Sequence, residues 1–250
     1  MATPPEPLMR LVVLYVDSLK IGGAERVTLT FARWLRQNGW TPIVLTRQSR
    51  TLDFYPIPAG VERAVEPPDP RWLHLLGLWG FPWRVRRLRH WLRQQQVSLA
   101  IGMTTKPAVK LLLAAHPLRI PCAVSERNFP PLKPMALPWG VLRRFSYRWA
   151  SLHIVQTRAT GEWLKQQLSA EPQLLLPNPV QWPLPRFEPE LDPDQWLSEV
   201  GVASDAPVLL AVGTKAHQKG FDLLVQAFAD LIPRLSLIHI SEPTRPLEIA

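Results

Sequence analysis

The sequence contains little cysteine and no long apolar run. Cys122 is the only cysteine in 250 residues, which excludes an internal disulfide framework and a metal site built from several cysteines. No apolar stretch reaches the roughly 18 residues that a membrane-spanning helix needs. The N-terminal MATPPEPLMR lacks the charged and apolar regions of a secretory signal peptide. We therefore expect a protein of the cytoplasm, which is a reducing compartment.

Internal repeats, low-complexity tracts and the nicotinamide-binding pattern G-x-G-x-x-G are also missing. What the chain does have is basic charge, with 29 Lys and Arg against 20 Asp and Glu and a net charge of +9. Such a charge favours anionic partners, namely nucleic acid, a lipid surface or phosphorylated small molecules, and a basic, soluble surface is the alternative. No nucleic-acid recognition motif is visible, so we expect no nucleic-acid partner.

Strand and helix patterns alternate along most of the chain. Residues 11–16 (LVVLYV) form a β-branched apolar run, which is typical of a strand buried on both faces of a parallel sheet. Residues 24–39 follow with apolar side chains at helical spacing. Further strands are predicted at residues 41–46, 61–67, 97–103, 120–128, 151–157 and 172–178, and further helices at residues 81–96, 106–116, 137–150 and 160–168.

This alternation predicts an α/β fold. Residues 10–178 are expected to form an N-terminal Rossmann-like domain with a doubly wound parallel sheet. Residues 179–206 are rich in Pro, Asp and Glu and predict an interdomain linker that holds a short helix at 194–201. Residues 207–234 begin with the apolar run PVLLAVG and continue as an amphipathic helix, so they predict only the first βα unit of a second Rossmann-like domain.

Ligands of open parallel sheets bind at the carboxyl ends of the strands, where four loops are of interest. In the first, Gly22 and Gly23 lie between a strand and a helix, and their N–H groups can face a phosphate or a sugar hydroxyl. A plain tight turn is the alternative. In the last, Lys215 and Lys219 flank a loop that ends at a helix N-terminus, and they form either a diphosphate cradle or two solvated lysines.

The second loop carries four consecutive polar residues, Ser125, Glu126, Arg127 and Asn128, directly after an apolar strand. They either line a cleft or cap and solvate a loop. In a cleft, they would contact acceptor hydroxyls or phosphates. Asn178, in LPNPV, is expected to make a turn between domains and to have no direct part in the chemistry.

Taken in order, GGAER, SERN, LPNPV and QKGFDLL resemble the glycosyltransferase family 4 enzymes of GT-B fold. The resemblance covers roughly residues 10–233, and its most specific pieces are GGAERVTLTFARWLRQNGW and HQKGFDLLVQAFADL. It implies a retaining transferase that uses a nucleotide sugar, UDP-linked, without a metal ion or other cofactor. It also implies two Rossmann-like domains around a central cleft, of which the N-terminal one holds the acceptor and the C-terminal one the donor.

The resemblance assigns roles to the loop residues. It places Gly22 and Gly23 beside the donor diphosphate, and Glu126 where many members carry a histidine near the transferred sugar, which makes Glu126 the catalytic candidate. Lys219 matches the phosphate-binding lysine of the family. The family's arginine is replaced by Thr214, with Lys215 next to it, although lysine lacks the planar fork of arginine.

The C-terminal end departs from the family. Members carry two glutamates eight positions apart in the donor domain, whereas Glu242 and Glu248 here are six apart and stand in a different context. Residues 235–245 (LSLIHISEPTR) resemble the in-frame translation of a transposase-type sequencing adaptor. We therefore expect residues 235–250 to be non-native, the second domain to be truncated, and His239 and Ser241 to have no catalytic role.

Residues 83–93 (WRVRRLRHWLR) predict a basic amphipathic helix with tryptophans, and residues 138–149 predict a second one. Such helices can lie on anionic membranes, in which case Trp83, Arg84, Arg87 and Trp91 would contact the lipid. The alternative is that the apolar stripe packs on the sheet and the arginines are solvated. Membrane contact would place the protein on the inner face of the plasma membrane.

The function predicted for the intact protein is transfer of a sugar to a lipid-linked or polysaccharide acceptor in cell-surface glycan biosynthesis. A sugar-nucleotide epimerase or a phosphorylase of the same fold is the first alternative. A non-catalytic binding module is the second, and it suits the truncated chain. The truncated chain itself is expected to be inactive.

Overall fold

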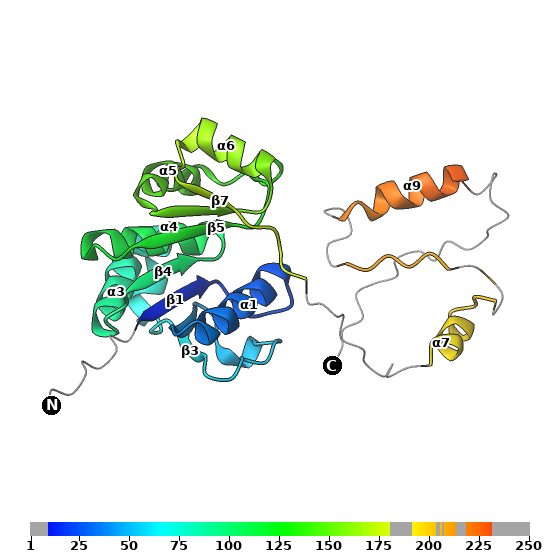
Figure 1. Ribbon diagram of the computed structural model, residues 1–250, viewed down its shortest axis with the longest axis horizontal. Coiled ribbons are helices and arrows are strands. Elements are labelled where there is room, and N and C mark those ends of the chain that lie inside the picture. The colour runs from blue at the N-terminus through cyan, green and yellow to red at the C-terminus, as the bar shows by residue number, and fades with distance from the viewer. Residues whose placement is uncertain (1–9, 181–191, 204–205, 207, 214–218, 232–250) are drawn as a thin grey trace, which may run out of the picture. The chain divides into compact units, whose positions relative to one another are not determined.

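The computed structural model describes residues 10–180, 192–203, 206, 208–213 and 219–231 (Figure 1). The chain divides into two compact units, Met1–Val180 and Gln181–Ala250, which we describe separately as unit 1 and unit 2. The predictions for Lys215 and for the adaptor-like residues 235–250 lie outside the described residues.

Unit 1 is built on one sheet of seven strands in the order β3-β2-β1-β4-β5-β6-β7. All neighbouring strands run parallel. The strand order reverses between β1 and β4, which is the switch point at which open α/β sheets bind ligands. The strands are β1 (Leu11–Val16), β2 (Thr41–Thr46), β3 (Glu62–Val65), β4 (Leu99–Gly102), β5 (Cys122–Glu126), β6 (Leu152–Val155) and β7 (Gln173–Leu175).

Helices cover both faces of this sheet (Figure 1). They are α1 (Gly23–Gln37), α2 (Arg71–Leu75), α3 (Phe81–Gln94), α4 (Thr105–Ala115), α5 (Leu137–Ser146) and α6 (Arg158–Leu168). Because side chains alternate along a strand, Val13 and Tyr15 of β1 join a core cluster with α3, α4 and α6, whereas Val12, Leu14 and Val16 join a second cluster with α1. The predicted doubly wound α/β sheet is confirmed.

Each predicted strand and helix of unit 1 is present in the structure, with ends that differ by a few residues. The basic helix α3 buries its apolar stripe, Val85, Leu88 and Leu92, against the sheet. The stripe therefore packs on the sheet, which is the alternative to membrane contact that the sequence left open.

A short segment before α3 has no counterpart in the sequence prediction. It consists of α2 and a 3₁₀ turn, η2 (Gly77–Gly80), both of which are too short to show a periodic pattern. Arg84 of α3 holds the segment in place, because its Nη1 donates to the Gly77 carbonyl at 2.7 Å and its Nη2 to the Leu73 carbonyl at 2.9 Å. One arginine therefore satisfies carbonyls at the ends of both short elements.

In unit 2 the described residues form the helices α7 (Pro193–Glu199) and α9 (Phe221–Leu231). Residues 208–213, where the sequence predicts the first strand of a second sheet, poorly supported because its parallel neighbours are lost, form no strand. Leu209, Leu210 and Val212 are 63%, 72% and 83% exposed. Within the described part of unit 2 no other strand is present to pair with this segment, and an apolar strand is stable only when neighbours satisfy and bury it.

Candidate active site

Two neighbouring pockets lie at the carboxyl ends of the strands on either side of the switch point. The Glu126 pocket, with a volume of about 480 Å³, is lined by Thr104, Thr105, Lys106, Glu126, Asn128, Lys133, Trp139 and Arg143, among others. The Tyr15 pocket, of about 510 Å³, is lined by Tyr15, Asp17, Glu66, Asp69, Phe81, Arg84, Lys110 and Trp139, among others. The two pockets share Asp17, Arg47, Lys106, Pro107 and Trp139, so they are adjoining parts of one groove.

Glu126 is the buried acid of this groove. It ends β5, and only 2% of it is exposed. The Tyr147 hydroxyl donates a hydrogen bond to its Oε1, and the Thr105 hydroxyl donates to its Oε2 at 3.1 Å. Burial raises the pKa of Glu126, and the hydrogen bond from Tyr147 and the charge of Arg143 oppose that rise. The carboxyl group is therefore oriented by two hydroxyl groups, and its burial favours the protonated form.

The other three residues of the predicted loop are divided between the two faces of the sheet. Asn128 lines the Glu126 pocket. Ser125 is fully buried, and Arg127 lies over the Phe31 ring of α1 at 5.3 Å and donates to Asn178 Oδ1 at 3.0 Å. Burial lowers the pKa of Arg127 to about 10. Glu126 and Asn128 thus meet in one pocket, whereas Ser125 and Arg127 are not among its lining residues.

The two glycines lie at the start of α1, and neither is among the residues that line the Glu126 pocket. Gly22 has extended backbone angles, φ 175° and ψ 158°, and Gly23 is the first residue of α1, so neither position requires the left-handed conformation of a tight turn. A Cβ atom added to Gly23 would meet nothing within 4 Å, and Glu25, two residues further on, lines the Glu126 pocket. The glycine at position 23 therefore leaves room for close approach of a ligand to the N-terminus of α1.

The candidate lysines belong to unit 2. Lys219 is exposed and lies two residues before α9 begins at Phe221. Gly220 between them has φ 70°, a left-handed conformation that favours glycine. Lys215 lies outside the described residues. The role that the resemblance gives to each lysine stays a prediction.

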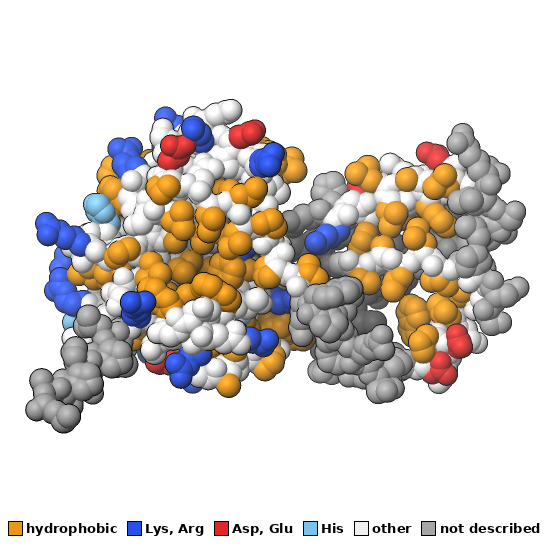
Figure 2. Space-filling model, viewed as in Figure 1, with side chains coloured by type: hydrophobic (Ala, Val, Ile, Leu, Met, Phe, Trp, Pro, Cys, Tyr) orange, Lys and Arg blue, Asp and Glu red, His pale blue; other side chains and the backbone are white. Residues whose placement is uncertain are grey.

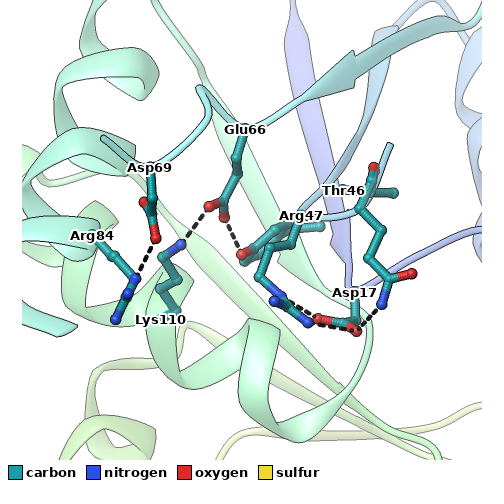
Figure 3. A network of polar contacts seen from close by, with 9 residues as sticks. Asp17, Thr46, Arg47, Glu66, Asp69, Arg84 and Lys110 are labelled. Carbon is teal, nitrogen blue, oxygen red and sulfur yellow. Dashed lines mark hydrogen bonds and ion pairs between the residues drawn. The ribbon is translucent and has the colours of Figure 1, made fainter. Parts of the chain in front are cut away.

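Sequence reasoning missed a buried charge cluster in the Tyr15 pocket (Figure 3). Glu66, just after β3, accepts hydrogen bonds from the Tyr15 hydroxyl and, at 2.5 Å, from Lys110 Nζ. The side chains of Lys110 and Glu66 are 7% and 12% exposed. Burial, followed by the charge of Glu66, raises the pKa of Tyr15 well above its ordinary value. The detectable signal was Lys110 itself, a lone cation within the apolar stretch VKLLLAA.

Two more ion pairs continue the network of Figure 3. Arg47 Nε, after β2, lies 2.9 Å from Asp17 Oδ1, after β1, and Arg84 Nε of α3 lies 2.5 Å from Asp69 Oδ2. Asp17 and Arg47 each follow a strand end directly, which is a sequence signal that could have pointed to them. These pairs neutralise most of the charge in the Tyr15 pocket.

The predicted membrane-contact residues differ in their surroundings. Trp83 is 49% exposed and packs edge-to-face on Trp72, which is 50% exposed. Arg84 is engaged by Asp69, Arg87 Nη2 donates to the Pro68 carbonyl at 2.8 Å, and the half-buried Trp91 packs against the core. Of the four, Trp83 is therefore the side chain that presents most apolar surface to solvent. Basic side chains spread along the edge of unit 1 that carries α3 and α4 (Figure 2).

The described residues show neither a membrane-spanning helix nor a metal-binding cluster. No helix among them has both the length and the apolar character that crossing a membrane requires. Likewise, no cluster of three or more His, Cys, Asp or Glu side chains in the described ranges is arranged to hold a metal ion.

The fold and its groove define the class: a Rossmann-like α/β protein with a ligand site at the switch point of a parallel sheet. The family model of Glycosyltransferase Family 4 matches residues 21–181, and the chain belongs to this family. A comparison with curated proteins found no match.

Two solved structures show the likeness in fold. HepE of Anabaena, crystallised with UDP and glucose, is 21% identical with a TM-score of 0.64 over 91% of this chain and 59% of its own. Sucrose-phosphate synthase from Thermosynechococcus elongatus is 16% identical with a TM-score of 0.61 over 95% of this chain and 64% of its own. The chain thus spans about three fifths of the length of these structures.

Proposed function

We propose that the intact protein is a retaining glycosyltransferase that moves a sugar from a nucleotide-sugar donor to an acceptor held by unit 1. The observation that supports this most directly is Glu126, a buried carboxyl group that lines a groove at the switch point in a chain of Glycosyltransferase Family 4. HepE, a structural neighbour, has been crystallised with UDP and with UDP-glucose, which supports a UDP-linked donor.

The chemistry needs the groups that border the groove. Departure of a nucleoside diphosphate builds negative charge on its β-phosphate, which a helix N-terminus and fixed cations stabilise. Retention without a covalent intermediate requires the acceptor hydroxyl to attack from the face that the diphosphate leaves. We assign Glu126 to the acceptor side of that reaction centre, the open start of α1 at Gly23 to the diphosphate, and Lys219 and Lys215 to the same diphosphate.

The present chain is proposed to lack this activity. A donor site of GT-B type needs a second parallel sheet, and within residues 192–203, 206, 208–213 and 219–231 the structure shows two helices and no strand. Residues 235–250 are proposed to be non-native, as their resemblance to an adaptor suggests. Turnover of any nucleotide sugar by the purified 250-residue chain would contradict this proposal.

The activity itself is tested on the protein that the native reading frame encodes beyond Arg234. We expect this protein to transfer labelled sugar from a UDP-sugar to a glycan acceptor, and Glu126→Ala to lower kcat by a factor of roughly 10² or more, the range typical of a positioned acid or base. Glu162→Ala, an exposed glutamate of α6, is the matched control. Release of epimerised sugar would instead support an epimerase. Phosphate-dependent release of a sugar 1-phosphate would support a phosphorylase, and binding without turnover would support a non-catalytic module.

We further propose that the acceptor is lipid-linked or a polysaccharide of the cell surface, and that unit 1 lies on an anionic membrane. Exposed apolar side chains support the membrane contact: Leu75 and Trp79, in the short segment before α3, are 89% and 85% exposed beside Trp83. Flotation with vesicles that contain anionic lipid at low salt should recover the protein. Trp79→Ala with Trp83→Ala should abolish recovery, whereas Trp34→Ala, which removes a 59% exposed tryptophan of α1, should not. Absence of binding by the parent chain would refute the contact.

A further inference from the structure

Three cations of the Glu126 pocket are without a carboxylate partner. Lys106 of α4, Lys133 of the loop before α5, and Arg143 of α5 all line the pocket. Within the described part of unit 1, none of the three lies within ion-pair distance of an acid. By contrast, the other three basic residues of the adjoining Tyr15 pocket, Arg47, Arg84 and Lys110, are paired with Asp17, Asp69 and Glu66, respectively.

Two of these cations are held in place by aromatic rings. Lys106 Nζ lies 5.4 Å from the centre of the Trp139 ring, and the Arg143 guanidinium lies 5.0 Å from that of Trp163. The Nε atom of Arg143 is buried and makes no hydrogen bond in the described part of the chain. An arginine nitrogen removed from water without an acceptor is costly, and a bound anion would supply that acceptor.

The acids of the same pocket leave this positive charge largely uncompensated. Asp17 is already paired with Arg47, and Glu126 is occupied by Tyr147 and Thr105. The one other lining acid is Glu25, on α1. Because the three cations come from separate elements around the pocket, they suit a compact group with several acceptor oxygens, and a phosphate monoester has three.

We propose that Lys106, Lys133 and Arg143 form a phosphate subsite in unit 1, which holds a phosphate group of the acceptor beside Glu126. The role of the subsite in holding an acceptor rests on the proposed glycosyl transfer. Its binding of phosphate does not, because that binding needs no donor. The adjoining Tyr15 pocket offers room for the rest of the acceptor. Trp139 and Phe81, which pack edge-to-face at 5.2 Å, both line this pocket.

The phosphate could be carried by a soluble sugar phosphate or by a lipid. Leu137 and Val141, on the helix that carries Arg143, are 81% and 59% exposed, so a lipid chain would find an apolar surface next to the subsite. Both sources present the same chemistry to the three cations. The experiment therefore has one arm for each.

The first arm measures binding of methyl phosphate to the 250-residue chain by NMR at low ionic strength. The second measures co-sedimentation with phosphatidylcholine vesicles that contain dodecyl phosphate. In each arm the parent chain is compared with Lys106→Ala combined with Lys133→Ala, two exposed positions whose truncation leaves the core intact. Lys165→Ala on α6, also exposed, is the matched control.

We expect the double variant to bind phosphate at least about tenfold more weakly, as loss of hydrogen bonds to a charged group predicts, and Lys165→Ala to bind like the parent chain. A loss confined to methyl phosphate assigns the site to a soluble acceptor, and a loss confined to the vesicles assigns it to a lipid phosphate. The proposal is overturned if the parent chain binds neither probe, or if the double variant binds both as well as the parent. If the intact protein binds phosphate but transfers no sugar, the proposed glycosyl transfer is refuted and the phosphate subsite stands.

Discussion

At the scale of single residues, Tyr147 links two buried titratable side chains. Its hydroxyl donates to Glu126, and its ring lies 5.6 Å from that of His153 on β6. Burial lowers the pKa of His153 to about 4 and raises the pKa of Glu126. Both groups are therefore driven toward their neutral forms, as expected where a low-dielectric core meets a ligand groove.

Substitution of Glu126 should change how stability depends on pH. The folded protein retains the Glu126 proton at pH values where the unfolded chain, with a glutamate pKa near ~4.3, has released it. The stabilisation due to this proton is thus complete below about pH 4.3 and is lost as pH rises through the folded-state pKa. Glu126→Gln cannot ionise and keeps an oxygen for Tyr147, so it should gain stability relative to the parent chain as pH rises.

Urea unfolding of the parent chain and of Glu126→Gln across the range from pH 4 to pH 8 checks this expectation. Glu162→Gln, an exposed glutamate of α6, is the control and should track the parent chain throughout. A constant difference between Glu126→Gln and the parent chain at every pH would show that the carboxyl group has no raised pKa.

At the scale of secondary-structure elements, the packing of α4 on β4 depends on a glycine. A Cβ atom added to Gly102 would lie 2.4 Å from the Cα and 2.6 Å from the Cβ of Ala108. These are backbone-proximal atoms that cannot rotate away. The close approach places the start of α4, with Thr105 and Lys106, directly at the end of β4, and so it sets one wall of the Glu126 pocket.

Gly102→Ala should therefore force α4 away from the sheet and lower the free energy of unfolding by about 1–3 kcal/mol, the usual cost of overpacking. Gly140→Ala is the matched control, because a Cβ at this position of α5 would meet nothing within 4 Å. Alanine within a helix is favoured over glycine by roughly 0.5–1 kcal/mol, so the control should be neutral or stabilising. Equal effects of the two substitutions in chemical denaturation would argue against the close approach.

At the scale of the whole molecule, the two core clusters lie within unit 1. The last residue that packs against either cluster is Leu176. The described helices of unit 2, by comparison, bury none of their residues completely. Figure 2 shows apolar side chains over α9, where Leu223 is 65% exposed. Among the described residues, the buried hydrophobic core is therefore confined to unit 1.

A chain of residues 1–180 should accordingly fold alone and unfold cooperatively, with a Tm within about 3 °C of that of the 250-residue chain, since no core contact is lost. Circular dichroism during heating measures both midpoints. As a control, removal of residues 172–180, which contain β7 and Leu176, should lower the midpoint clearly. A truncated chain without a cooperative transition would contradict this independence.

The sequence determined the strands of unit 1 and its helices other than the short α2. The apolar run of β1 and the stripe of α3 are local patterns, and burial of one face or both follows from them directly. The strand expected at residues 208–212 shows the limit of such patterns, because a strand forms only where neighbours pair with it. The loop after β5 was also predicted from its polar residues, but alternation along the strand, visible only in the sheet, sends Glu126 to the groove and Arg127 to Phe31.

By itself the sequence determined an α/β unit of Glycosyltransferase Family 4 type with candidate ligand loops at the ends of its strands. The tertiary structure alone decided which side chains share those ends. Lys110 pairs with Glu66 across 44 positions, and Tyr147 meets Glu126 across 21. The strand order brings these partners together, and burial raises the pKa values of Glu126 and Tyr147. Local periodicity records which face of an element is buried, but it carries no information on which distant side chain lies opposite.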